Sequence, residues 1–458
     1  MKRTLVLNVV GLTPSLLGEH TPNLSRLAAR GRSVPIHTIT PAVTCAVQST
    51  YLTGKLPRDH GVVANGWYFR DLAQVALWRQ SNALVAGEKL WHIARRRDPH
   101  FTVAKLFWWY NMYADVDWAV TPRPIYRANG RKLPDVHTYP SELRDRLQTS
   151  LGTFPLFNFW GPRADIVSSR WIAECASRVE SDHQPTLNLV YLPHLDYELQ
   201  RSGPHGAKVP DELRRVDALC GRLIDEAHAN DRRVVVLSEY GITEVTRPVH
   251  INRALRRAGL ISYRIEEGEE HLDPGASAAF AVADHQIAHV YVRDAARIPD
   301  VRRVLESLEG IERVLDDAGK RELGLDHARS GELVVIAAKD RWFTYYWWLD
   351  DARAPDYART VDIHSKPGYD PAELFIDPSI RIPPLAVGHR LFRSKVLNQR
   401  VLLDVIPLDA SMVRGSHGRP TDDPSEGPLF ITDTPSLLDG SKLEATEVRD
   451  VLLRHVFD

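Results

Sequence analysis

The chain has 458 residues, enough for a large core and for two or three lobes, and its 58 Lys and Arg residues nearly balance 59 Asp and Glu residues. This balance argues against a nucleic-acid-binding tail and against a basic surface that binds membranes. The three cysteines, Cys45, Cys175 and Cys220, are widely spaced and form no metal or redox motif.

The N-terminus does not have the pattern of a signal peptide, and no apolar run approaches the roughly 18 residues of a membrane helix. Together with the cysteine pattern, this predicts a cytoplasmic protein that neither spans nor binds a membrane.

The first predicted elements are a buried strand, a turn and a helix. Residues 4–10 form a continuous apolar run, and helical spacing over 22–30 ends at Gly31. This opening is typical of an open α/β sheet, whose sites lie at the carboxyl ends of the strands. Residues 67–159 are irregular and rich in aromatic side chains. We therefore interpret 66–165 as an insertion beside the site, with a packed aromatic cluster as the default and a substrate platform as the alternative.

The middle of the chain alternates helices and strands. The pattern predicts helices over 168–179 and 211–228, and buried strands over 186–192 and 233–237. Strands that follow one another in this order predict a parallel sheet with right-handed crossovers.

Residues 246–360 are interpreted as a cap or second lobe. They contain a predicted helix over 251–258 and apolar runs at 288–292 and 333–337. The sequence thus predicts an α/β protein whose core consists of 1–245 and 361–458.

The stretch from Pro41 to Asn65 carries the clearest motif, P-A-V-T-C-A-V-Q-S-T-Y-L-T-G-K-L-P-R-D-H-G-V-V-A-N. Thr44 precedes a run that is compatible with a helix and ends before Gly54. A hydroxyl at the start of a helix can cap it, or it can act as a nucleophile where backbone N–H groups and the helix dipole stabilise an anion. For Thr44 taken alone, both roles remain open.

This stretch resembles the nucleophile segment of the nucleotide pyrophosphatase/phosphodiesterase branch of the alkaline phosphatase superfamily. The matching residues are Leu52-Thr53-Gly54, Pro57, His60-Gly61-Val62 and Asn65. The resemblance implies that Thr44 attacks phosphorus and forms a covalent phospho-enzyme intermediate. It also implies an alkaline-phosphatase-like fold, in which helices flank a mostly parallel central sheet and a lid or cap lobe is inserted.

The resemblance further implies two metal ions, usually zinc, that activate the nucleophile and neutralise the transferring phosphoryl group. The family holds them with an Asp after the first strand, an Asp-x-x-x-His pair, an Asp-His pair and a late His. Asp196 matches the second Asp, and His417 matches the late His. Gln200 stands where the family has the His of the first pair, and an amide oxygen binds a hard cation better than zinc.

Two more ligand positions are altered. Ser238-Glu-Tyr-Gly matches the family's Ser-Asp-His-Gly, so Glu239 replaces the Asp and Tyr240 replaces the His, while Val10 replaces the first Asp. We expect Glu239 both to bind metal and to assist Thr44. The altered set argues against a dizinc centre. It leaves open one divalent ion, either zinc or a harder ion such as manganese, magnesium or calcium, or a pocket rebuilt for different chemistry.

Two other polar clusters are candidates to complete the site. Asp362 and His364 form an Asp-x-His pair, and we include both among the possible metal ligands. Asp284 and His285, with His289 nearby, form the other cluster. For each cluster the alternative is a structural hydrogen-bonding role.

The sequence therefore predicts a metal-dependent hydrolase or group-transfer enzyme that acts on a phosphodiester, pyrophosphate or phosphonate of a small metabolite. No nucleic-acid or membrane partner is expected, and nothing in the sequence indicates the oligomeric state. One alternative keeps the fold without the hydrolysis, as a binding or scaffold protein or as a biosynthetic enzyme with altered chemistry. The other is an unrelated α/β enzyme with chance matches, in which Thr44, Asp196, Glu239 and His417 would lie far apart.

Overall fold

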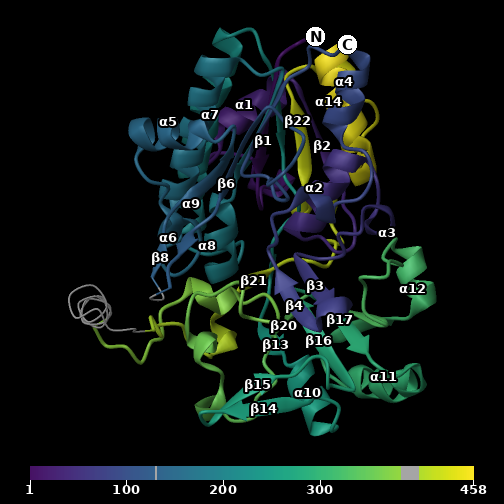
Figure 1. Ribbon diagram of the computed structural model, residues 1–458. Helices are drawn as coiled ribbons and strands as arrows, with labels where there is room; N and C mark the ends of the chain where they lie inside the picture. Colours follow the sequence, from purple (N-terminus) through teal and green to yellow (C-terminus); the bar gives the residue numbers. More distant parts are fainter. Residues whose placement is uncertain (129–130, 383–401) are drawn as a thin grey trace.

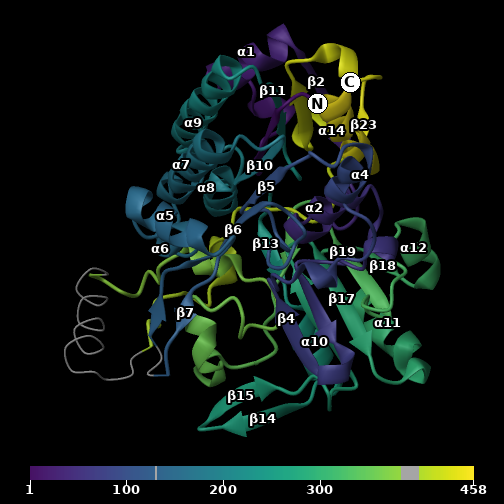
Figure 2. The ribbon, with the colours of Figure 1, turned by 45° about the horizontal axis from the view of Figure 1, so that its top comes forward.

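A computed structural model of the chain describes residues 1–128, 131–382 and 402–458. A large sheet flanked by helices forms one lobe, and a smaller sheet forms the other (Figures 1 and 2). The large sheet runs in the order β23 (Leu443–Glu444), β2 (Arg32–His37), β22 (Leu429–Thr432), β11 (Arg233–Leu237), β1 (Thr4–Val9), β10 (Leu187–Leu192), β5 (Val103–Leu106), β6 (Trp118–Pro122) and β9 (Val136–Tyr139).

The centre of this sheet is parallel, as the sequence predicts. β1 pairs in parallel with both β10 and β11, and only β22 and β9 run antiparallel to their neighbours. β1 and β10 are buried along their whole length, which explains why both are continuous apolar runs. Their carboxyl ends, and that of β11, point to the same edge of the sheet.

Helices cover both faces of the large sheet (Figure 1). One layer contains α1 (Pro22–Arg30), α5 (Glu142–Leu151), α6 (Leu156–Phe159), α7 (Ile166–His183), α8 (His194–Ser202) and α9 (Val209–Ala229). The other contains α2 (Thr44–Thr53), α3 (Pro57–His60), α4 (Leu90–Arg97) and α14 (Val448–Phe457). The predicted helices over 22–30, 168–179 and 211–228 are confirmed as α1, α7 and α9.

The smaller lobe contains an antiparallel sheet in the order β16 (Ala279–Asp284), β17 (Ile287–Val292), β19 (Leu333–Ala337) and β18 (Ile311–Leu315). Its helices are α10 (Ile251–Arg257), α11 (Ile298–Glu306) and α12 (Asp317–Glu322). All of these elements fall within 246–360, the range expected to form a cap. The boundaries of that division stay a prediction.

The described residues also form five two-stranded ladders. They are β3 (Gly66–Phe69) with β4 (Gln74–Leu77), β7 (Ile125–Tyr126) with β8 (Lys132–Leu133), β12 (Thr243–Glu244) with β21 (Gly415–Ser416), β13 (Arg247–Val249) with β20 (Arg341–Phe343), and β14 (Tyr263–Glu266) with β15 (Glu269–Leu272).

The segment 66–165 differs from the expected irregular insertion, because it supplies β5, β6 and β9 to the large sheet. These strands are only four or five residues long, and β5 carries a lysine at its third position. The Nζ of Lys105 is buried and donates to the carbonyl oxygens of Trp109 and Tyr110, each 2.8 Å away. A charged residue inside a buried strand interrupts the apolar pattern by which strands are recognised.

Candidate active site

Thr44 is the first residue of α2, and its hydroxyl does not cap the helix. The preceding residue, Val43, takes the cap position in extended conformation, and no side chain caps this end. Gly54 ends the helix with a φ of 64°, a left-handed conformation that glycine adopts without strain. The Oγ1 of Thr44 instead lies 3.1 Å from the hydroxyl oxygen of Tyr240, which follows β11.

Asp196 lies in the first turn of α8, directly after β10, and both of its carboxylate oxygens are hydrogen-bonded. The Tyr240 hydroxyl donates to Oδ1 at 3.2 Å, and the Gln200 amide donates to Oδ2 at 2.7 Å. Burial raises the pKa of Asp196 to about 7, and the two hydrogen bonds act in the opposite direction. Tyr240 therefore links the Thr44 hydroxyl to this carboxylate.

Gln200 connects the site to the segment 362–375. Its amide nitrogen faces Asp196, and its Oε1 accepts a hydrogen bond of 3.1 Å from the Tyr369 hydroxyl. The amide oxygen, which is the only atom of Gln200 able to bind a cation, thus faces away from Asp196.

Glu239 is completely buried and is held by two amide side chains. Asn8 donates to its Oε1 at 2.5 Å, and Gln48 donates to the same oxygen at 2.6 Å. The other oxygen, Oε2, and the Oδ1 of Asn8 are buried without a hydrogen-bond partner. Burial raises the pKa of Glu239 to about 8, and the hydrogen bonds from Gln48 and Asn8 act in the opposite direction.

His417 is one of the two inner rings in a stack of four. The centroid of its ring is 3.6 Å from that of Tyr240, at an interplanar angle of 5°, and 3.7 Å from that of His285. His285 in turn lies 3.7 Å from the ring of Tyr369. Burial lowers the pKa of both histidines well below the usual value, so both rings are neutral.

The tautomer of His417 follows from its contacts. Its Nδ1 lies 2.8 Å from the carbonyl oxygen of Ala42, which can only accept, so Nδ1 carries the proton. The lone pair is therefore on Nε2, which lies 3.9 Å from Oδ1 of Asp196.

The turn between β16 and β17 ties the smaller lobe to the start of α2. Asp284 accepts from the backbone N–H and the side-chain amide of Asn65 at 2.8 and 3.0 Å, and from Nδ1 of His285 at 2.8 Å. The Oδ1 of Asn65 then accepts from the N–H of Cys45 at 2.9 Å. His285 itself has a φ of 62°, which is uncommon for a residue with a side chain.

The structure brings Thr44, Asp196, Gln200, Glu239 and His417 together. It does not place Asp362 and His364 among them. The carboxylate of Asp362 accepts from the backbone N–H groups of His364 and Ser365, each at 3.2 Å, and from the Ser365 hydroxyl at 2.7 Å. This is a turn closed by an aspartate, which accounts for the Asp-x-His spacing without a metal.

Sequence reasoning missed three residues of the site, Asn8, Gln48 and Tyr369. Amide and phenol side chains match no ligand motif. The family motif therefore gave no role to Gln48, and the apolar run of β1 gave none to Asn8. One signal was present for Asn8, a polar residue inside an otherwise apolar strand.

The residues present do not fit a two-metal centre. Val10 offers no ligand atom and is completely buried, and the Tyr240 hydroxyl fills the space between Thr44 and Asp196 by bonding to both. A neutral phenol with this geometry is a poor cation ligand. Oδ1 of Asp196 and Nε2 of His417 remain, 3.9 Å apart, as the two atoms available to a single cation.

One other cluster in the described part of the chain contains three potential ligand atoms. Asp165, His194 and Glu212 place them within 4.8 Å of one another. Arg215 already supplies the positive charge there, because its Nη1 lies 2.9 Å from Oδ1 of Asp165 and 3.1 Å from Oε2 of Glu212. His194 completes the cluster by a 2.7 Å contact with Glu212. We interpret the cluster as structural.

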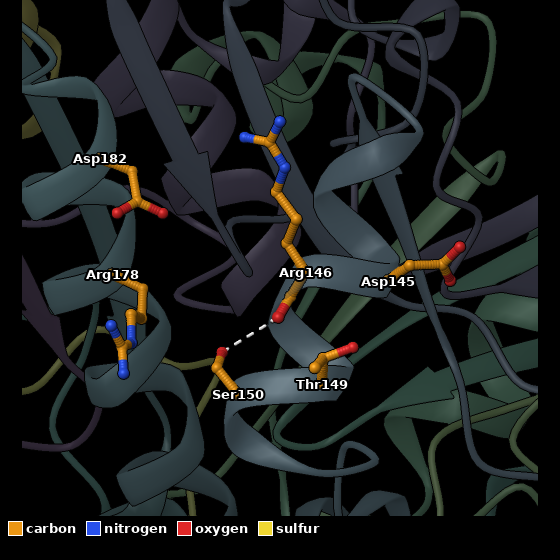
Figure 3. Close-up of a pocket in the computed structure, with 6 residues that line it drawn as sticks. All are labelled: Asp145, Arg146, Thr149, Ser150, Arg178 and Asp182. Carbon is orange, nitrogen blue, oxygen red and sulfur yellow. Dashed lines mark hydrogen bonds between the residues drawn. The ribbon is translucent and has the colours of Figure 1, made fainter.

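A shallow surface hollow, lined by none of the site residues described above, lies between α5 and α7 (Figure 3). Its lining residues are Asp145, Arg146, Thr149, Ser150, Arg178 and Asp182. The hydrogen bond drawn there, from the Ser150 hydroxyl to the Arg146 carbonyl, lies within α5 and serves the helix.

The fold and the placement of Thr44 define an alkaline-phosphatase-like α/β protein. The sequence profile of the type I phosphodiesterase / nucleotide pyrophosphatase family matches residues 4–370. The chain belongs to this family, whose members are phosphoester hydrolases that typically depend on divalent metal ions. No curated protein matches the chain.

Solved structures agree with this fold. Phosphonoacetate hydrolase from Sinorhizobium meliloti 1021, in complex with phosphonoformate, superposes with a TM-score of 0.60 and 13% identity, over 99% of this chain and 96% of that one. An inactive variant of murine ectonucleotide pyrophosphatase/phosphodiesterase 5, in complex with AMP, gives 0.57 and 14%, over 100% and 95%. The human enzyme gives 0.59 and 13%, over the same shares. At these identities the likeness concerns the fold alone.

In the described ranges, no helix combines the length and the apolar character that crossing a bilayer requires.

Proposed function

We propose that this chain hydrolyses a phosphodiester, pyrophosphate or phosphonate of a small metabolite, with Thr44 as the nucleophile. The observation that carries the proposal is the hydrogen-bonded line from Thr44 through Tyr240 to Asp196. Three distant segments of the chain supply these residues, at the edge of the sheet where sites of open α/β proteins lie. Chance similarity gives no reason for this convergence.

The reaction follows from the position of Thr44. Its Oγ1 forms a bond to phosphorus while the bond from phosphorus to the leaving group breaks. The leaving group keeps the electron pair of that bond and takes up one proton, which balances the proton that the Thr44 hydroxyl loses. The N-terminus of α2, a helix of ten residues, directs its positive dipole end at the developing charge. A water oxygen then forms a bond to phosphorus, the bond from phosphorus to Oγ1 breaks, and one proton of the water returns to Oγ1.

We further propose at most one divalent cation, held by Asp196 and His417 through the atoms that face each other. When bound, it would supply the Lewis-acid charge stabilisation that the family obtains from two ions. Gln200, Glu239, Asp362 and His364 are not needed for this ion. The donor pair of one oxygen and one nitrogen is compatible with zinc or manganese.

The test uses the purified full chain with bis-p-nitrophenyl phosphate and p-nitrophenyl phenylphosphonate, and follows release of nitrophenolate. Thr44→Ala is expected to lower kcat at least about a thousandfold, because the reacting oxygen is removed. Thr53→Ala is the matched control, since Thr53 lies in the same helix and its buried hydroxyl donates to the Ser49 carbonyl. Elemental analysis of the same sample should find no more than one ion per chain. Turnover that survives in Thr44→Ala would refute the proposal.

The alternative is a member of the family that binds or modifies a ligand without hydrolysing it. It is favoured by the closed site, in which Thr44 is 3% exposed and Tyr240 and His417 are each 2% exposed. Lack of Thr44-dependent turnover on both esters, in a protein whose fold is verified by circular dichroism, would support this alternative.

A further inference from the structure

Tyr240 stands at a position where the resemblance predicts a metal-binding histidine, and the structure gives its hydroxyl two defined partners. The ring is fixed independently of the hydroxyl, because it stacks face to face on His417 and is 2% exposed. The hydroxyl contacts Oγ1 of Thr44 at 3.1 Å and Oδ1 of Asp196 at 3.2 Å. Its two partners are thus the proposed nucleophile and a carboxylate of the site.

The direction of these hydrogen bonds follows from the chemistry of the groups. The Tyr240 hydroxyl donates to Asp196, so its proton points at that carboxylate. The phenol oxygen is then left as an acceptor toward Thr44, and the Thr44 proton points at Tyr240. The lone pairs of Oγ1 are consequently directed away from this contact.

We propose that the Tyr240 hydroxyl orients the Thr44 nucleophile, in place of the second metal ion for which this site has no room. The proposal rests on the proposed function, and it makes Tyr240 a positioning residue. In this arrangement Asp196 also fixes the direction of the phenol proton. A phenol held in this way costs no reorganisation when the reaction starts, since its ring and its proton are already placed.

A second phenol lies beside Thr44. The Thr44 hydroxyl also interacts with that of Tyr191, which is buried on β10. Tyr240 is the phenol that donates a hydrogen bond to Asp196. The proposal therefore distinguishes the two phenols, and substitution of each one separates them.

The experiment compares Tyr240→Phe with the wild type on bis-p-nitrophenyl phosphate. The substitution keeps the stacked ring and removes only the hydroxyl. We expect kcat to fall about a hundredfold with KM changed less than about threefold, because a misdirected nucleophile affects the reaction step more than binding. Tyr51→Phe is the control: Tyr51 is equally buried, lies on α2 and donates to the Ser238 carbonyl at 2.8 Å, away from Thr44. It should keep the wild-type kcat.

Rescue is the second measurement, and it also serves if Tyr240→Phe folds poorly. Tyr240→4-aminophenylalanine restores a group that both donates and accepts. Its kcat should be at least about tenfold higher than that of Tyr240→Phe. Wild-type kcat in Tyr240→Phe, together with loss of activity in Thr44→Ala, would overturn this inference and leave the proposed function intact. A fall in kcat with Tyr191→Phe but not with Tyr240→Phe would overturn it as well. Full activity in Thr44→Ala would remove the proposed function, and this inference with it.

Discussion

At the scale of single residues, His60 shows how the matched segment is held in place. Its ring is completely buried at the end of α3. Nδ1 accepts from the N–H of Val62 at 3.1 Å, so Nε2 carries the proton and donates to the Thr50 hydroxyl at 3.0 Å. Both ring nitrogens are satisfied only in the neutral form. His60 thus joins the helix that begins at Thr44 to the loop that follows it.

This arrangement predicts a loss of stability in acid. Burial, and the nearby His327 and Arg329, lower the pKa of His60 from 6.5 to about 3. Between these values the unfolded chain binds a proton that the folded chain excludes, so the free energy of unfolding falls as the pH falls, by about 1.4 kcal/mol per unit. From pH 7.5 to 5.0 the contribution of His60 is about 2 kcal/mol.

Urea unfolding at pH 7.5 and 5.0 measures this contribution. In His60→Gln, the fall in free energy of unfolding between the two pH values should be smaller than in the wild type by about 2 kcal/mol. His100→Gln, which replaces an exposed histidine, should follow the wild type. An unchanged pH dependence in His60→Gln would show that the imidazole does not titrate on unfolding as proposed.

How far the site can be predicted from sequence depends on the residue type. Thr44, Asp196 and His417 were recognised because each lies in a short motif with fixed spacing, and the structure places them together. Tyr369 belongs to no such motif, and its role depends on a contact with Gln200 across 169 positions. Polar side chains that act through one long-range hydrogen bond have no local signature, so spacing cannot reveal them.

At the scale of elements, the segment 362–375 is fixed by a buried ionic cluster. Nζ of Lys366 lies 2.7 Å from Oδ2 of Asp370 and 2.8 Å from Oε1 of Glu373, and all three residues are at most 5% exposed. The indole N–H of Trp160 donates to the other oxygen of Glu373. The cluster holds the turn from which Tyr369 reaches Gln200.

Removal of the lysine should strongly destabilise this segment. Lys366→Met leaves two buried carboxylates without a positive partner, which is expected to cost about 3–5 kcal/mol in free energy of unfolding. The triple change Lys366→Met, Asp370→Asn and Glu373→Gln should recover most of that loss, since it removes the charges together. Thermal and urea unfolding measure both variants.

Lys442→Met is the matched control, because Lys442 pairs with Glu444 at 3.0 Å on the surface, where its side chain is 67% exposed. Its effect should stay below about 1 kcal/mol. If Lys366→Met were as mild as Lys442→Met, the carboxylates would have to be solvated or protonated at little cost.

Elements with a clear pattern were predicted well, and those without one were not. The apolar run at 233–237 is β11 with the same ends, and the predicted helix over 22–30 is α1. The strands β5, β6 and β9 were missed because they are short and because Lys105 lies inside one of them. The Asp-x-His pair at 362–364 was included as a ligand pair from spacing alone, which an aspartate-closed turn satisfies equally well.

At the scale of the whole molecule, the candidate site is closed by parts that come from both lobes. His285 from the smaller lobe and Tyr369 from the segment 362–375 continue the stack of rings that starts at Tyr240. The backbone N–H of Tyr369 also donates to the carbonyl of Ala283 in β16 at 2.9 Å. A substrate can therefore reach Thr44 only when some of these contacts separate.

Tyr369→Ala tests whether Tyr369, the last ring of this stack, closes the site. Loss of the ring removes the stacking on His285 and the hydrogen bond to Gln200, and both interactions favour the closed state. The measurement is labelling with diethylpyrocarbonate, followed by peptide mass spectrometry. His285 and His417 should be modified at least about tenfold faster than in the wild type. A tenfold change corresponds to a loss of roughly 1.4 kcal/mol in the free energy of opening the site. Exposed His100 is the internal standard, and Tyr113→Ala, which removes a tyrosine that is 74% exposed, is the control. Equal labelling in the wild type and in Tyr369→Ala would mean that the site opens elsewhere, and that Tyr369 serves only to hold Gln200.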